Sequence, residues 1–247
     1  MAFVYRFSAK RYRGHPRKAN RRRKPVPAQN PLGTVLDGRV PFAPEKPNCI
    51  IVAHESSRTG CPINTWSMLC ELTKTFNVLA VSLKRGPIDD LFRKSSTWCA
   101  IADASIRYES ESLETWMAPI LEARPYAFAI ANSVCTWALL PVLSWHRIPS
   151  IVCIHEFAQY CNINELRAVF LYGTKVVYSS RICLKATAAA LGIDTCNVPV
   201  IAQGKSALPV DKTQLFDERE AYLTADIRRR KAENGEFVVL GAGTVTY

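Results

Sequence analysis

The sequence predicts an α/β fold built on a doubly wound parallel sheet. Short apolar runs of four to seven β-favouring residues recur along the chain, and amphipathic stretches of helix length separate them. Polar residues follow the ends of several runs. Strands that alternate with helices in this way are typical of βαβ units, in which neighbouring strands run parallel. The 247 residues, 48% of them hydrophobic, suffice to bury the core of such a fold.

Each element follows from its own pattern. The predicted strands are residues 49–53, 78–83, 98–102, 126–131, 150–154, 175–179 and 197–201. The predicted helices are residues 62–76, 88–94, 113–122, 134–145, 163–171 and 181–191. The stretch 125–146 contains no Asp, Glu, Lys or Arg and has about the length of a membrane span. Because Asn132, Ser133 and Pro141 interrupt it, we interpret it as a buried strand followed by a helix.

The net charge of +11 lies almost entirely in the first 24 residues. That segment carries ten Lys and Arg, from Arg6 to Lys24, and no acidic residue, whereas the rest has 22 basic and 21 acidic residues. A nearly neutral body argues against a nucleic-acid-binding surface on it. Residues 25–48 hold six prolines and two glycines, which favours an extended linker. We therefore expect residues 1–47 to form a disordered basic arm and linker, and the folded body to begin at residue 48.

The cysteines and the arm bear on the compartment. Nine cysteines, none of them in a C-x-x-C pair and several inside apolar runs, favour a reduced, cytoplasmic protein. The arm lacks the apolar stretch of a secretory signal. It could be a transit peptide, a patch between Arg6 and Lys24 that rests on anionic membrane lipid, or a solvated extension.

The loop after the first predicted strand is the first candidate site. Gly60 lets the backbone approach a ligand, and the helix that begins near Pro62 offers free N–H groups to an anion. Thr59 and Gly60 are thus candidates for a diphosphate, and Glu55 and Arg58 for the surrounding cleft. A simple strand-to-helix turn explains the same residues, since neither G-x-G-x-x-G nor a P-loop is present.

The second candidate is the pair His155 and Glu156, at the end of the strand 150–154. Histidine can orient a ligand or donate to it near neutral pH. Glu156 could raise the pKa of His155 or hold its tautomer. The pair lacks a second histidine four residues away, so we expect no metal. A purely structural hydrogen-bonding role for His155 stays open.

Polar residues occur at equivalent strand ends elsewhere in the chain. They are Asn132, Ser133, Ser180, Gln203 and Gly204. In the pairs Asn132–Ser133 and Ser179–Ser180, the side chains could simply cap the next helix. Because the carboxyl ends of parallel strands meet at one edge of the sheet, the set together predicts a polar cleft suited to hydroxyl-rich or phosphorylated ligands.

The last part of the chain predicts the start of a second domain. Residues 206–236 are polar with a helical stretch, and 237–247 form an apolar strand that runs into a loop with Gly241 and Gly243. We therefore expect residues 48–205 to be the first domain, 206–236 a connection, and 237–247 the first strand of an incomplete second domain.

Five blocks of sequence, in order, resemble the group 1 (family 4) glycosyltransferases. The blocks are CIIVAHESSRTGCP from residue 49, IHEF from 154, VVYSSR from 176, VIAQGK from 200 and FVVLGAGTV from 237. The resemblance implies a GT-B enzyme, in which two Rossmann-like domains face each other across a cleft. This chain would supply the domain that binds the sugar acceptor and the first strand of the domain that binds the nucleotide-sugar donor.

The resemblance also implies roles for particular residues. Gly60 matches the glycine that approaches the donor diphosphate, and His155 matches a histidine near the transferred sugar. Gln203 and Gly204 match the crossover between the domains, while Gly241 and Gly243 match the first loop of the donor domain.

We therefore expect hexosyl transfer from a nucleotide-diphosphate sugar to a carbohydrate or lipid-linked acceptor, retaining and independent of metal or cofactor. The family's basic diphosphate clamp and E-x7-E carboxylates match no segment before Tyr247, so we expect little activity from this chain alone. The alternative is a non-catalytic Rossmann-like module whose basic arm docks on nucleic acid or on anionic membrane; nucleic acid is the weaker possibility.

Overall fold

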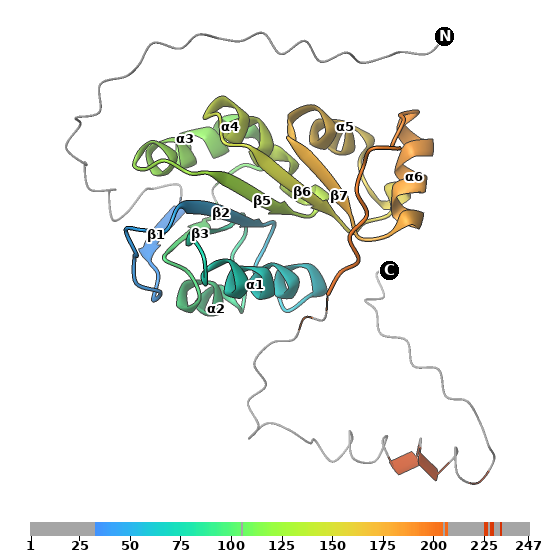
Figure 1. Ribbon diagram of the computed structural model, residues 1–247, viewed down its shortest axis with the longest axis horizontal. Coiled ribbons are helices and arrows are strands. Elements are labelled where there is room, and N and C mark those ends of the chain that lie inside the picture. The colour runs from blue at the N-terminus through green and yellow to red at the C-terminus, as the bar shows by residue number, and fades with distance from the viewer. Residues whose placement is uncertain are drawn as a thin grey trace.

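The fold is a three-layer α/β sandwich. The computed structural model describes residues 33–104, 106–204 and 206, with five further positions between 225 and 233. These described residues form a seven-stranded, mostly parallel sheet between two layers of helices (Figure 1). The predicted α/β class with a Rossmann-like, doubly wound sheet is confirmed.

The elements follow the predicted alternation. The strands are β1 (Gly33–Asp37), β2 (Asn48–Ala53), β3 (Asn77–Ser82), β4 (Trp98–Ala102), β5 (Phe128–Asn132), β6 (Ser150–Ile154) and β7 (Lys175–Tyr178). The α-helices are α1 (Gly60–Leu72), α2 (Asp89–Lys94), α3 (Ser110–Glu122), α4 (Leu140–Trp145), α5 (Ile163–Tyr172) and α6 (Arg181–Leu191). Two short 3₁₀ helices complete the set, η1 (Val134–Leu139) and η2 (Ala158–Tyr160).

The order of the strands creates a switch point beside β2. The sheet runs β1-β4-β3-β2-β5-β6-β7, with β1 antiparallel and the other strands parallel. The chain builds outward from β2 to β4 and then returns to the opposite side of β2 as β5. Loops on the two sides of such a point diverge, which opens a crevice at the carboxyl ends of the strands.

Burial on both faces explains why the strands are continuous apolar runs. Helices α1 and α2 cover one face of the sheet, and α3 to α6 cover the other (Figure 1). Along β2, Ile50 and Val52 pack into the core that contains Trp116, whereas Ile51 packs into the core that contains Phe92. Central strands of a parallel sheet bury alternate residues against opposite helix layers in this way.

The folded body begins earlier than we expected. Strand β1 lies inside the segment 1–47, which we assigned to an arm and linker, and pairs with the outer edge of β4. The turn that follows β1 is held by Asn77, whose side chain accepts a bond from Ala43 N at 2.9 Å and donates to Ala43 O and Lys46 O at 2.8 Å. The bonds to Asn77 produce no local sequence pattern, because Asn77 lies more than 30 residues from the turn in sequence.

Other boundaries differ locally. The predicted helix 134–145 is η1 followed by α4, and Pro141, which has no N–H group, stands in the first turn of α4. The predicted strand 197–201 makes an isolated bridge, between Val200 and Tyr178. The predicted second-domain strand 237–247 lies outside the described residues, as does most of the connection 206–236. Among the residues that are described, no helix has both the length and the apolar character needed to cross a bilayer.

Replacing Asn77 by alanine tests how far the β1 segment belongs to the folded body. The Asn77 side chain is buried and makes three backbone bonds to the 43–46 turn. We expect Asn77→Ala to lower the free energy of unfolding, measured by urea denaturation, by about 1–3 kcal/mol. The exposed control Asn164→Ala should change it by no more than about 0.5 kcal/mol. Equal effects of the two variants would mean that the turn adds nothing to stability.

Candidate functional site

The candidate site lies at the carboxyl edge of the sheet, around His155. Asn132 ends β5, His155 follows β6, and α1 begins just beyond β2. The parallel register aligns Ala53, Asn132 and Cys153 on adjacent strands, so the residues that follow these strands start from one level. The topology thus brings together side chains that are 23 to 71 residues apart in sequence.

A buried amide joins the three elements. The Asn132 side chain is fully buried, and its Oδ1 lies 2.6 Å from His155 Nε2. Its Nδ2 donates to Thr65 Oγ1 at 2.8 Å and to Cys61 O at 3.2 Å, both in the first turns of α1. The Cys61 thiol donates in turn to Asn132 O at 3.2 Å. Asn132 therefore fixes the position of His155 relative to the start of α1.

This network also determines the tautomer of His155. Because Asn132 Nδ2 donates to α1, its Oδ1 is left as a hydrogen-bond acceptor, so the imidazole proton sits on Nε2. His155 Nδ1 is buried and has no hydrogen-bond partner among the described residues. Burial lowers the pKa of His155, although the charge of Glu156 acts in the opposite direction. At neutral pH the ring is neutral.

Glu156 serves the backbone rather than the histidine ring. Its carboxylate accepts bonds from the Ser133 hydroxyl, from His155 N at 3.0 Å and from Val134 N at 3.4 Å. As expected, the charge of Glu156 acts to raise the pKa of His155, but burial has the larger effect, so the pKa is lowered overall. Asn132, rather than Glu156, bonds the ring and holds its tautomer.

Ser133 carries backbone strain at the centre of the site. Its φ of 114° lies in the region that favours glycine. Its hydroxyl donates to Glu156 and accepts from Cys135 N at 3.0 Å, which stabilises the turn from β5 into η1. A strained residue costs on the order of 1–3 kcal/mol and persists where its surroundings enforce it, often at functional sites.

The start of α1 is open to a ligand. Thr59 stands at the N-cap position but its side chain makes no capping bond to the described helix; its hydroxyl lies 2.8 Å from the Ser57 hydroxyl instead. A β-carbon built on Gly60 would meet no atom within 4 Å apart from its chain neighbours and the backbone of its own helix, so the fold itself does not require glycine there. Arg58 is exposed in the same loop. The first turn of α1 offers the N–H groups of Gly60 and Cys61, since Pro62 has none and Ile63 N donates to Thr59 O. With the helix dipole and the open space beside Gly60, these groups suit an anion.

Two cavities flank this edge and share no lining residue. The first, the His155 cavity, has a volume of about 500 Å³ and runs along α1 and strands β5 to β7, with Asn132, His155, Gln203 and Gly204 in its wall. The second, the Tyr108 cavity, has a volume of about 540 Å³ and lies beyond the ends of β2, β3 and β4.

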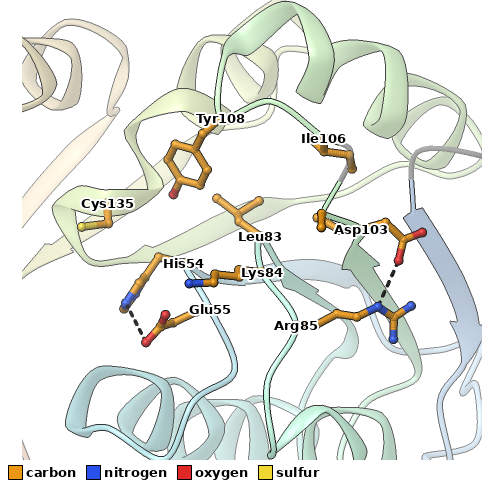
Figure 2. Close-up of a pocket in the computed structure, with 11 residues that line it drawn as sticks. His54, Glu55, Leu83, Lys84, Arg85, Asp103, Ile106, Tyr108 and Cys135 are labelled. Atoms are coloured by element: carbon orange, nitrogen blue, oxygen red, sulfur yellow. Dashed lines mark hydrogen bonds and ion pairs between the residues drawn. The ribbon is translucent and has the colours of Figure 1, made fainter.

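Figure 2 shows the Tyr108 cavity between two tiers of side chains. The upper tier holds Tyr108 and Ile106, from the loop that follows β4; the lower tier holds His54, Glu55 and Lys84. His54 Nε2 lies 3.7 Å from Glu55 Oε1, and His54 Nδ1 is buried without a partner in the described part of the chain. Burial lowers the pKa of His54 against the opposing charge of Glu55.

The loops that form the lower tier are held together by Ser56. Its backbone N–H donates to Lys84 O at 3.1 Å, its carbonyl accepts from Ile88 N at 3.0 Å, and its hydroxyl bonds Asp89. Gly86 passes so close that a β-carbon there would lie 2.2 Å from Ser56 O. The lower tier of the cavity is therefore firmly positioned on the sheet.

The structure sorts the predicted residues into groups. Asn132, His155, Gln203 and Gly204 share the His155 cavity, whereas Glu55 lies in the Tyr108 cavity. Ser180 caps α6, accepting from Cys183 N at 3.3 Å. Gly241 and Gly243 lie outside the described residues.

Sequence reasoning missed most of the Tyr108 cavity. The residues not singled out were His54, Lys84, Arg85, Asp103, Tyr108 and Cys135. His54, Lys84, Arg85 and Asp103 lie just beyond a strand end, and that position was the signal available in the sequence; Tyr108 lies farther along the loop after β4, and Cys135 lies in η1. Over the residues that the structure describes, no cluster of three or more His, Cys, Asp or Glu is arranged to hold a metal ion.

Comparison with known proteins gives a structural likeness. No protein-family model and no curated protein sequence matches the chain. The crystal structure of Anabaena HepE in complex with UDP and glucose is similar, with a TM-score of 0.51 and 13% identity, over 64% of this chain and 44% of that one. HepE in complex with UDP has a TM-score of 0.50 and 12% identity, over 74% of this chain and 50% of that one. This chain thus spans half or less of the HepE chain, and the likeness concerns the fold.

The His155 network makes a prediction that proton titration can test. We expect the His155 Cε1–H resonance, followed by NMR, to titrate below the usual histidine pKa of 6.5, because burial disfavours the charged ring. Asn132→Asp places a carboxylate against Nε2 and should raise this pKa. The control, Asn132→Ala, removes the same bonds to α1 but adds no negative charge, so it should not raise the pKa of His155.

The sign of the accompanying stability change follows from linkage. The unfolded chain binds a proton at His155 near pH 6.5, whereas the folded chain resists it, so the free energy of unfolding should fall as the pH is lowered below about 6.5. Asn132→Asp should weaken this fall. A wild-type His155 that titrates at or above 6.5 would contradict the assignment of a neutral, buried ring.

Proposed function

We propose that the protein takes part in glycosyl transfer from a nucleotide-diphosphate sugar. The observation that supports this most directly is the fold shared with HepE, which is known in complex with UDP and glucose, the two halves of a nucleotide-sugar. The second support is local, since a neutral histidine and an open helix N-terminus lie at the carboxyl edge of the sheet. This is the edge at which Rossmann-like sheets hold their ligands.

The start of α1 is our proposed seat for the donor diphosphate. The N–H groups of its first turn carry the positive end of the helix dipole, and Gly60 leaves room for close approach. Thr59 offers a hydroxyl beside them. Such groups stabilise the charge that develops on a departing diphosphate, which is the main electrostatic demand of the reaction.

His155 is our proposed contact to the transferred sugar. Asn132 holds it as the Nε2–H tautomer, and Gln203 and Gly204 lie in the same cavity wall. A sugar hydroxyl both donates and accepts, so a neutral imidazole in a fixed orientation can select one hydroxyl without adding charge. We further propose that the transfer retains the anomeric configuration and uses neither a metal nor a cofactor.

A GT-B enzyme would bind the donor between two domains. We propose that the described domain is the acceptor side of such an enzyme, and that the donor domain, begun by Gly241 and Gly243, supplies the remaining diphosphate contacts. This chain spans half or less of the HepE chain, so the transfer activity of a complete two-domain enzyme is a proposal here.

The basic arm bears on where this reaction takes place. Ten cationic residues between Arg6 and Lys24 would be attracted to anionic lipid by on the order of 1 kcal/mol each near the surface. We propose a cytoplasmic protein that contacts the membrane peripherally through this arm, as suits a lipid-linked acceptor. A nucleic-acid partner for the arm is the alternative, which the nearly neutral body does not favour.

Gly60→Val tests the diphosphate seat. The added side chain fills the open space beside Gly60, where the β-carbon would meet no atom within 4 Å apart from its chain neighbours and its own helix backbone. We expect the affinity for UDP or UDP-glucose, measured by isothermal titration calorimetry, to fall about tenfold or more. The valine side chain would keep the diphosphate from the N-terminus of α1. The thermal midpoint should hardly change. Asn164→Val, in the exposed first turn of α5, is the control and should leave affinity intact.

Turnover tests the role of a second domain. We expect the purified 247-residue chain to show weak or no transfer from UDP- or GDP-sugars. Transfer is measured by the release of the nucleoside diphosphate. Where product forms, its anomeric configuration by NMR should match that of the donor. Robust transfer or hydrolysis by this chain would contradict the need for a donor domain, and an inverted product would contradict retention.

A further inference from the structure

The Tyr108 cavity has an apolar side built around one aromatic ring. The residue Tyr108 is 40% exposed overall, and its ring packs edge-to-face on Trp137, with 6.4 Å between ring centroids. Leu83, Ala102 and Ile106 contribute further apolar surface to the wall. Burial raises the pKa of Tyr108, so its hydroxyl stays protonated and available as a donor. A braced aromatic ring of this kind is a platform for the apolar C–H face of a ring-shaped ligand.

The polar side of the cavity is balanced in charge. Arg85 Nε lies 3.0 Å from Asp103 Oδ1, so this cation is matched within the wall. Lys84 and Glu55 are the other formal charges in the wall, of opposite sign. The two cations and two carboxylates therefore cancel, and the buried His54 ring adds no charge at neutral pH. A pocket built for an anion would carry an excess of cationic groups.

The wall nevertheless offers many hydrogen bonds. Lys84 supplies donors, Glu55 supplies acceptors, and His54 Nδ1 is a buried nitrogen whose hydrogen-bonding capacity no described residue meets. A ligand that brings closely spaced hydroxyl groups would satisfy donors and acceptors together. Its volume is also suitable, since small-molecule sites span roughly 300–1,000 Å³.

We propose that the Tyr108 cavity binds a neutral sugar ring, stacked on Tyr108 and hydrogen-bonded by His54, Glu55 and Lys84. A phosphorylated or otherwise anionic ligand lacks a matching excess of positive charge here. In the proposed glycosyl transfer, on which this inference rests, the cavity is the subsite for the sugar acceptor. It lies next to the His155 cavity but is separate from it. The specificity of the reaction for a neutral acceptor ring then follows from the wall, not from the basic arm.

Saturation-transfer NMR with the 247-residue chain tests this assignment. Methyl glucoside and maltose serve as neutral probes, and methyl glucuronide and glucose 6-phosphate as anionic probes, all without nucleotide. We expect saturation transfer to the neutral probes, with apparent affinity at least fivefold higher than for the anionic ones. Tyr108→Ala should weaken neutral binding roughly tenfold, the order of loss expected when an aromatic contact is removed.

Two matched variants separate stacking from other effects. Tyr108→Phe keeps the ring and should retain binding within about threefold. Tyr160→Ala removes a tyrosine that is 83% exposed and lines neither cavity, so it should have no effect. Circular dichroism of Tyr108→Ala controls for folding; if that variant unfolds, Lys84→Met, at an exposed position in the wall, replaces it and should also weaken binding.

The same samples are titrated with UDP, so that this inference and the proposed function can fail separately. Loss of sugar binding in Tyr108→Ala with UDP binding intact supports a separate subsite. Stronger binding of the anionic probes, no transfer to any neutral probe at millimolar concentrations, or equal binding by Tyr108→Ala would overturn the sugar site, whatever UDP does. Sugar binding without any UDP binding would instead count against the donor seat at α1.

Discussion

The arrangement of the site depends on one buried amide. Asn132 ends β5, the strand next to β2 at the switch point. Its side chain bonds His155, which follows β6, and Thr65 in α1. A primary amide is suited to this position because it donates and accepts at once. A carboxylate could not donate to Thr65, and a leucine would bond neither His155 nor Thr65, although the Thr65 hydroxyl would keep its bond to Cys61 O. Because these bonds lie in a buried place, losing them should lower the stability of substituted variants.

Two differently built cavities follow from this topology. The strands on one side of the switch point lead into loops that Ser56 and Asp89 tie closely together, and these loops form a charge-balanced wall. The strands on the other side lead to the His155 cavity, which lies along the sheet beside α1. A sheet edge that divides in this way holds two cavities in fixed relation on a common frame.

Much of the fold could be predicted from the sequence, because it depends on local periodicity. The strands β2 to β7 are runs that are apolar on both faces, and their helices carry apolar residues at helical spacing. Strand β1 was not predictable in this way, since its pairing with β4 and the Asn77 contacts join distant segments in a proline-rich stretch. The isolated bridge at Val200 shows the opposite error, an apolar run that does not become a strand.

The candidate site was predictable in its place but not in its partners. The positions of His155 and Asn132 after strand ends indicated that both face the same edge, yet their 2.6 Å contact depends on register. Glu156 illustrates the limit: adjacency to His155 suggested a partner for the ring, but backbone N–H groups and Ser133 take its carboxylate. Tyr108 becomes meaningful only once Trp137, nearly thirty residues later, is seen to brace it.

The antiparallel strand β1 has a consequence for association between molecules. A parallel sheet that ended at β4 would expose a row of unpaired backbone groups, which is a template for edge-to-edge pairing with another chain. Five residues of β1 occupy that row, and their own outer edge is short. At the opposite side β7 is only four residues long and begins with the exposed, charged Lys175. Both margins of the sheet are thus poor templates for edge-to-edge aggregation.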